Sequence, residues 1–196
     1  MHKLTVFSML GYANSLIRVP LLALCLLVVA PSAGWATNFQ VLDAETRLHH
    51  GVYLVDADID FKLSAASREA LENSVPLTMQ LTLQVRKQRN WLWDQTVANL
   101  EQRYQLQYQS LAQQYVVTNL NSHQLHSFPT YAAAIEYMGR LRAFPLLDQT
   151  LLDADTRYEV RLRAELDISS LPAPLRPVAY VSNAWRLRSD WYRWTL

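Results

Sequence analysis

The sequence predicts a mainly β protein, an antiparallel β-sandwich of immunoglobulin-like or similar type with two short helices. Three segments alternate strictly between apolar and polar residues, two short segments carry helix-capping residues, and polar or proline-rich stretches separate them. Alternation with a period of two gives a strand one apolar and one polar face, which is typical of antiparallel sheets. About seven such strands with few helices favour two packed sheets.

The strands follow from this alternation. It is strongest in residues 53–63, 77–85 and 158–166, where apolar side chains occupy every second position. Weaker alternation predicts further strands at residues 39–49, 93–104, 104–108, 114–119, 179–187 and 191–194.

Two segments are predicted to be helical. Ser64 can cap a helix over residues 65–73, and Thr130 can cap a second helix over residues 131–143. The second segment has an apolar stripe, and Pro145 follows it, so we expect the helix to end there.

Three polar or proline-rich segments connect these elements. Residues 87–90 separate two strands and predict a hairpin turn, whereas residues 119–129 predict a polar loop. Residues 171–177 contain three prolines, which lack the amide donor of an interior strand. They predict a stiff, extended connection between the last two strand regions.

The N-terminal 36 residues predict a signal peptide. A basic segment without acidic residues precedes the apolar run 21–30, and small residues at 32–36 predict cleavage after Ala36. The run is about half as long as a membrane-spanning helix requires, although its retention as an anchor stays an alternative. We therefore expect one periplasmic β-sandwich domain over residues 37–196, without a stable membrane span after cleavage.

The composition and net charge of this domain exclude some classes of partner and of chemistry. Residues 37–196 hold all 17 acidic residues and lack two of the 18 basic ones, so their net charge is about −1. This charge gives no electrostatic footprint for nucleic acid. The single cysteine, Cys25, lies in the predicted signal peptide, so the exported domain has neither a disulfide nor a thiol nucleophile.

An aspartate triplet on a predicted strand is the first candidate for metal chemistry. Asp56, Asp58 and Asp60 resemble the start of a calcium-binding loop. However, Phe61 stands where that loop needs glycine, and Ser67 stands where it needs a bidentate glutamate. We therefore interpret the triplet as a solvated strand face.

The histidines and the remaining motifs do not predict catalysis. The four histidines of the exported domain are His49, His50, His123 and His126. Adjacent histidines on a strand point to opposite faces, and the second pair lies in a predicted loop, so we expect no metal site. A nucleophile elbow and a phosphate-binding glycine loop are both missing. We expect neither a cofactor nor an enzymatic activity.

Aromatic residues near the C-terminus are the strongest indication of function. Tryptophan and tyrosine dominate binding hot spots, and arginines alternate with tryptophans in this part of the chain. The alternative is that the tryptophans fill the sandwich core. The candidate binding residues are Trp185, Arg186, Arg188, Trp191, Arg193, Trp194 and, further upstream, Trp91.

An ordered set of motifs resembles the DUF4390 family of exported proteobacterial proteins. The set consists of Val-Pro-Leu at 75–77, Trp-Leu-Trp-Asp at 91–94, Tyr-Gln-Ser-Leu at 108–111 with Tyr115, Phe-Pro-Thr-Tyr at 128–131, Arg-Leu-Arg at 161–163 with Leu166-Asp167, Leu-Pro-Ala-Pro-Leu at 171–175 and Trp-Arg-Leu-Arg-Ser-Asp-Trp at 185–191. Members commonly carry glycine where this chain has Ser74. The resemblance implies no activity, cofactor or catalytic residue.

These observations predict a non-catalytic periplasmic module of the cell envelope that binds a protein or peptide. A ligand-binding accessory to an envelope sensor is the second hypothesis. The third and least favoured hypothesis is a metal-assisted hydrolase that uses His123, His126 and the aspartate triplet.

Overall fold

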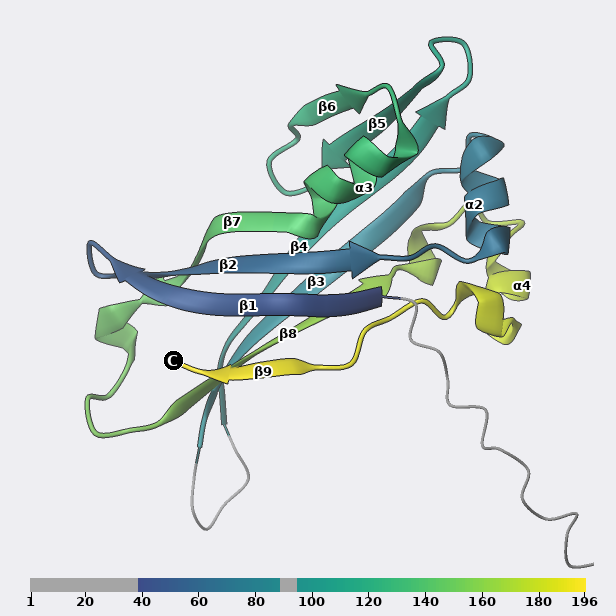
Figure 1. Ribbon diagram of the computed structural model, residues 1–196. Helices are drawn as coiled ribbons and strands as arrows, with labels where there is room; N and C mark the ends of the chain where they lie inside the picture. Colours follow the sequence, from purple (N-terminus) through teal and green to yellow (C-terminus); the bar gives the residue numbers. More distant parts are fainter. Residues whose placement is uncertain (1–38, 89–94) are drawn as a thin grey trace, which may run out of the picture. The chain divides into compact units, whose positions relative to one another are not determined.

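The structure, a computed structural model, describes residues 39–88 and 95–196. The predicted cleavage site after Ala36 and the tryptophans Trp91 and Trp93 lie outside the described residues. The described chain forms two antiparallel sheets, as the alternation predicted (Figure 1).

The first sheet has three strands in the order β1-β2-β7, and the second has six in the order β6-β5-β4-β3-β8-β9. Their bounds are β1 Phe39–His49, β2 Val52–Phe61, β7 Arg140–Asp148, β6 Leu125–Phe128, β5 Gln114–Asn119, β4 Gln95–Gln109, β3 Leu77–Lys87, β8 Tyr158–Leu166 and β9 Tyr192–Thr195. The pairing of β3 with β4 confirms the predicted hairpin, but its turn falls largely outside the described residues.

The core lies between the inner faces of the two sheets. Leu81 and Leu83 of β3 lie opposite Ala164 and Leu162 of β8, and all four are fully buried. Phe39 and Phe61, directly opposite each other on β1 and β2, pack edge to face with ring centroids 5.0 Å apart. The apolar positions of the sequence alternation therefore form the interior.

Helix α2, Ala65–Glu72, and helix α3, Tyr131–Gly139, begin where the capping residues predicted. Ser64 Oγ accepts a hydrogen bond of 3.2 Å from the amide of Ser67, and Thr130 Oγ1 accepts one of 3.2 Å from the amide of Ala133. Both bonds satisfy amides that have no partner in the first helical turn.

The prediction that the second helix extends over residues 131–143 was wrong. It ends at Gly139, and β7 begins at the next residue. Packing explains this end, because a Cβ on Gly139 would lie 2.3 Å from the carbonyl oxygen of Ile59 in β2. Pro145 lies within β7, which tolerates proline because β7 is an edge strand.

Three further expectations were corrected. The predicted loop at 119–129 contains the short edge strand β6, which pairs with β5. The predicted strands at 93–104 and 104–108 form one continuous strand, β4. In the predicted connection at 171–177, residues 171–175 are neither helix nor strand, and only Arg176 and Pro177 belong to helix α4, Arg176–Val181. Pro177 suits a first helical turn. The predicted strand at 179–187 was wrong, because this segment contains the end of α4 and a 3-10 turn, Asn183–Trp185.

Two edge strands from different sheets lie beside each other on one side of the sandwich, β1 and β9 (Figure 1). Trp194 Nε1 donates a hydrogen bond of 2.6 Å to Thr46 Oγ1, and the hydroxyl of Tyr192 donates one of 3.4 Å to Asp43. These bonds connect the two sheets near the middle of β1. Among the described residues, no helix is long and apolar enough to cross a membrane.

Candidate functional site

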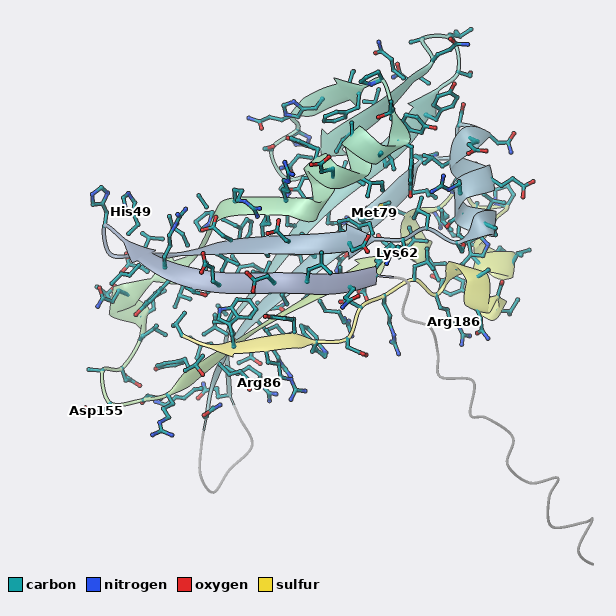
Figure 2. The ribbon with its side chains drawn as sticks, in the orientation of Figure 1. His49, Lys62, Met79, Arg86, Asp155 and Arg186 are labelled. Atoms are coloured by element: carbon teal, nitrogen blue, oxygen red, sulfur yellow. The ribbon has the colours of Figure 1, made fainter. Side chains whose placement is uncertain are left out.

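The structure separates the predicted binding residues into two groups. Trp185 is only 7% exposed and belongs to the core, and Trp194 lies on the inner face of β9, opposite Val160. The guanidinium of Arg186 donates a hydrogen bond of 3.0 Å to the carbonyl oxygen of Tyr180 and lies beside α4 (Figure 2). These three residues have structural contacts, and Trp91 lies outside the described residues.

The second group gathers around Trp191, which is half-buried just before β9. The guanidinium carbons of Arg161 and Arg163 lie 4.9 and 4.7 Å from the centre of its ring. Both arginines occupy polar positions of β8, two residues apart and therefore on one face of the strand. The indole is thus held by a pair of cation–π contacts.

Two of the predicted arginines complete this surface. Arg193 on β9 lies directly opposite Arg161 in the β8–β9 register, and Arg188 lies opposite Glu165. Both Arg188 and Arg193 are exposed. We call Trp191, Arg161, Arg163, Arg188 and Arg193 the Trp191 surface.

Sequence reasoning identified three members of the Trp191 surface and missed the two on β8. The sequence did not show which strand pairs with this edge of β8. Once β9 is placed beside it, the polar positions of Arg161 and Arg163 come next to Trp191. The alternation located these positions on the polar face, but it did not pair them with the C-terminal strand.

The charge of the Trp191 surface favours an anionic contact. Like charges directly opposite each other in a sheet repel, as Arg161 and Arg193 do. Arg163 forms a 3.2 Å ion pair with Glu165, yet its Nε is buried without a hydrogen-bond acceptor among the described residues.

A cleft of about 350 Å³ adjoins the Trp191 surface. It lies between the first residues of β1 and the segment that leads into β9. Its lining residues are Phe39, Gln40, Val41, Ser189, Asp190, Trp191 and Tyr192. Among the described strands, β1 pairs with β2 alone, so its outer edge borders this cleft.

Ser189 fixes the wall of the cleft on the β9 side. Its hydroxyl oxygen accepts a hydrogen bond of 3.0 Å from the amide of Ala164 and donates one of 2.8 Å to the carbonyl oxygen of Asp190. The amide of Ser189 also donates a bond of 2.8 Å to the carbonyl oxygen of Ala164. The backbone that presents Trp191 is therefore anchored to β8.

Burial and hydrogen bonds act in opposite directions on Asp167, next to the end of β8. Burial alone would raise the pKa of this carboxyl, but hydrogen bonds from Ser169 and Ser170 and the nearby charge of Arg103 hold the pKa below its usual range. The Arg103 guanidinium donates a hydrogen bond of 2.6 Å to Asp167 Oδ2. This carboxylate is therefore ionised at neutral pH and neutralises Arg103.

The aspartate triplet of β2 takes part in ion pairs. Asp56 pairs with Arg47 at 3.2 Å, Asp58 with Arg142 at 2.6 Å and Asp60 with Lys62 at 2.9 Å. The amide of Ala143 also donates a hydrogen bond of 2.8 Å to Asp56. The first two carboxylates thus connect β2 to its neighbours β1 and β7.

His49, His50 and His126 have aromatic neighbours. The rings of His49 and His50 lie 4.0 Å apart at the β1–β2 turn, and His126 lies 4.8 Å from the ring of Tyr137. In residues 39–88 and 95–196, no three histidine, cysteine or acidic side chains are grouped closely enough to hold a metal ion.

No curated protein and no solved structure matches the chain. The family model described as a domain of unknown function, DUF4390, matches residues 36–195, which include every strand and helix described above. The chain therefore belongs to the DUF4390 family.

Proposed function

We propose that this chain is a non-catalytic, exported module of the bacterial envelope that binds a protein partner in the periplasm. The Trp191 surface is the contact site. The observation that carries the proposal is the position of Trp191, which contacts two arginines of β8 and also lines the cleft beside β1.

The chemistry of this surface favours an acidic peptide segment as the bound part of the partner. Tryptophan and arginine are the residues most enriched in binding hot spots. Arginine binds carboxylates through paired, charge-assisted hydrogen bonds, and Arg188 and Arg193 are exposed for such contacts. The facing pair Arg161 and Arg193 would lose repulsion when a carboxylate binds between them.

The cleft suits the main chain of the same segment. The N-terminal part of β1 is a strand edge, and an extended peptide can bind such an edge through backbone hydrogen bonds. Apolar side chains of the peptide would then contact Trp191, which is half-buried and lines the cleft. We expect the acidic side chains to contact the arginines.

A direct binding assay tests this proposal. The probe is a fluorescein-labelled peptide of alternating aspartate and tyrosine, and a second peptide has asparagine in place of aspartate. We expect the acidic peptide to bind more tightly, and its affinity to fall with salt because exposed charges are screened. Trp191→Ala and Arg193→Glu should each weaken binding about tenfold or more, as hot-spot losses do.

The matched control is Arg140→Glu, which reverses one exposed arginine on β7 of the other sheet. It should leave peptide affinity unchanged. Equal affinity of the two peptides would overturn the proposal, as would equal losses in Arg193→Glu and Arg140→Glu.

Crosslinking in cells tests the physiological partner. A photoreactive amino acid at position 193 should form adducts whose attachment point on the partner lies in an acidic segment, whereas the same amino acid at position 140 should not. Attachment to a basic or neutral segment, or the same adducts from both positions, would contradict the proposal. The mass of the protein recovered from the periplasm tests export, and it should correspond to a chain that begins at Thr37.

A further inference from the structure

A second cavity, of about 440 Å³, opens where helix α3 meets the end of β2. Its lining residues are Leu42, Ile59, Asp60, Phe61, Lys62, Leu63, Arg68, Tyr131, Ala132, Ile135 and Glu136. These residues come from β1, β2, α2, α3 and the segment after β2, and none belongs to the Trp191 surface. Figure 2 shows Lys62 just beyond the end of β2.

Two irregularities of the fold build this pocket. The β1–β2 register shifts between Val41 and Asp43, and the intervening Leu42 is left 55% exposed. Gly139 permits α3 to lie against the backbone of β2 at Ile59, which places the first turns of α3 along the pocket. A leucine that a bulge leaves exposed beside a concave apolar surface is available for a ligand.

Opposite charges neutralise each other in the pocket with one exception. Asp60 pairs with Lys62 at 2.9 Å, and Glu136 of α3 pairs with Arg140, the first residue of β7. Arg68 forms no ion pair within the described part of the chain, and its guanidinium carbon lies 4.2 Å from the centre of the Tyr131 ring. The remaining charge is therefore positive and is positioned by an aromatic ring.

Tyr131 adds a neutral hydrogen-bonding group. Burial raises the pKa of this phenol, and the neighbouring Arg68 charge only partly opposes the effect. The hydroxyl is therefore protonated at neutral pH. Together, Arg68 and Tyr131 provide two donor groups at one place in a pocket whose remaining surface is largely aliphatic.

We propose that this pocket binds a small apolar anion, a carboxylate attached to an aliphatic or aromatic body. The carboxylate binds Arg68, and the apolar body lies against Leu42, Ile59 and Ile135. The volume is within the range of small-molecule sites, which combine an apolar lining with a few polar groups. A free aliphatic acid and the C-terminal residue of a peptide share this chemistry.

Calorimetric titration with defined probes tests the proposal. The exported protein is titrated with octanoate, with octanol and with octylamine, which share one chain and differ in charge. The second arm uses N-acetyl-glycyl-leucine and its C-terminal amide. We expect the acids to bind more tightly than their neutral or cationic counterparts. Whichever acid, octanoate or the dipeptide, binds more tightly identifies the source of the carboxylate.

Two variants connect binding to the pocket. Arg68→Gln removes the charge and should weaken octanoate binding about tenfold, because charge-assisted hydrogen bonds are stronger than neutral ones, while octanol binding stays unchanged. Ala132→Trp places a large ring on the exposed wall and should reduce binding of both probes. Arg157→Gln is the matched control, and thermal unfolding confirms that each variant is folded.

The outcomes separate this site from the Trp191 surface. Trp191→Ala should leave octanoate affinity unchanged, so failure of one proposal does not imply failure of the other. Equal affinity for octanoate and octanol, no effect of Arg68→Gln, or no binding of any probe would each overturn the pocket proposal.

Discussion

Substitution of Gly139 by alanine tests how closely α3 packs on the first sheet. The added Cβ would lie 2.3 Å from the carbonyl oxygen of Ile59, which is about 1 Å closer than ordinary van der Waals contact. Because the obstructing atom belongs to the backbone of β2, no side-chain rotation relieves the clash. The helix must move away from the sheet, which disturbs the packing of Met138, a residue only 1% exposed.

The expected loss follows from two opposing effects. Overpacking of a close-packed site costs about 1–3 kcal/mol, whereas alanine is about 1 kcal/mol more favourable than glycine inside a helix. Gly139 is the last residue of α3, so only part of that gain applies. We expect Gly139→Ala to lower the free energy of unfolding by about 2 kcal/mol, which is about 4–8 °C in Tm for a domain of this size.

Urea unfolding followed by circular dichroism measures this change. Ala132→Gly, at an exposed position of the same helix, is the control for helix propensity and should cost up to about 1 kcal/mol. If Gly139→Ala is as stable as the unsubstituted protein, or more stable, the close approach of α3 to β2 is refuted.

Two further predictions concern stability. Leu162→Ala shortens a fully buried core side chain on β8, the strand that pairs with both β3 and β9, so it should cost about 2–5 kcal/mol in urea unfolding. An unchanged midpoint would contradict its place in the core. Asp167 has a folded-state pKa below its unfolded value, so its ionised form stabilises the fold above about pH 4, and this contribution is lost as the pH falls through the folded pKa. Asp167→Asn should therefore be less stable than the unsubstituted protein at pH 7, with the difference shrinking below about pH 4. Parallel stability curves from pH 7 to pH 2 would be inconsistent with this coupling.

Local pattern predicted the central strands and the helix starts. Strands β2, β3 and β8 have an alternation strong enough to identify both faces, and Ser64 and Thr130 cap their helices as expected. These features depend on near neighbours in the chain, which the sequence displays directly.

Local pattern failed where packing decided the structure. The segment after Gly139 has helical spacing but pairs with β2, because the close contact at Ile59 ends the helix there. The predicted strand at 179–187 instead begins within helix α4, where Ala179 is fully buried against the domain.

The candidate binding residues show the same division. Alternation and composition identified the aromatic and basic character of the C-terminal segment, and they predicted the β-sandwich from the sequence alone. Only the tertiary structure decided which of these residues meet, because the contacts of Trp191 with Arg161 and Arg163 depend on the pairing of β9 with β8. The tertiary structure also decided that Trp185 is buried in the core and that Trp194 bonds to Thr46 across the two sheets. It likewise decided that Arg68 contacts the ring of Tyr131 beside a pocket. Such contacts join residues far apart in the chain, and no local periodicity specifies the register between them.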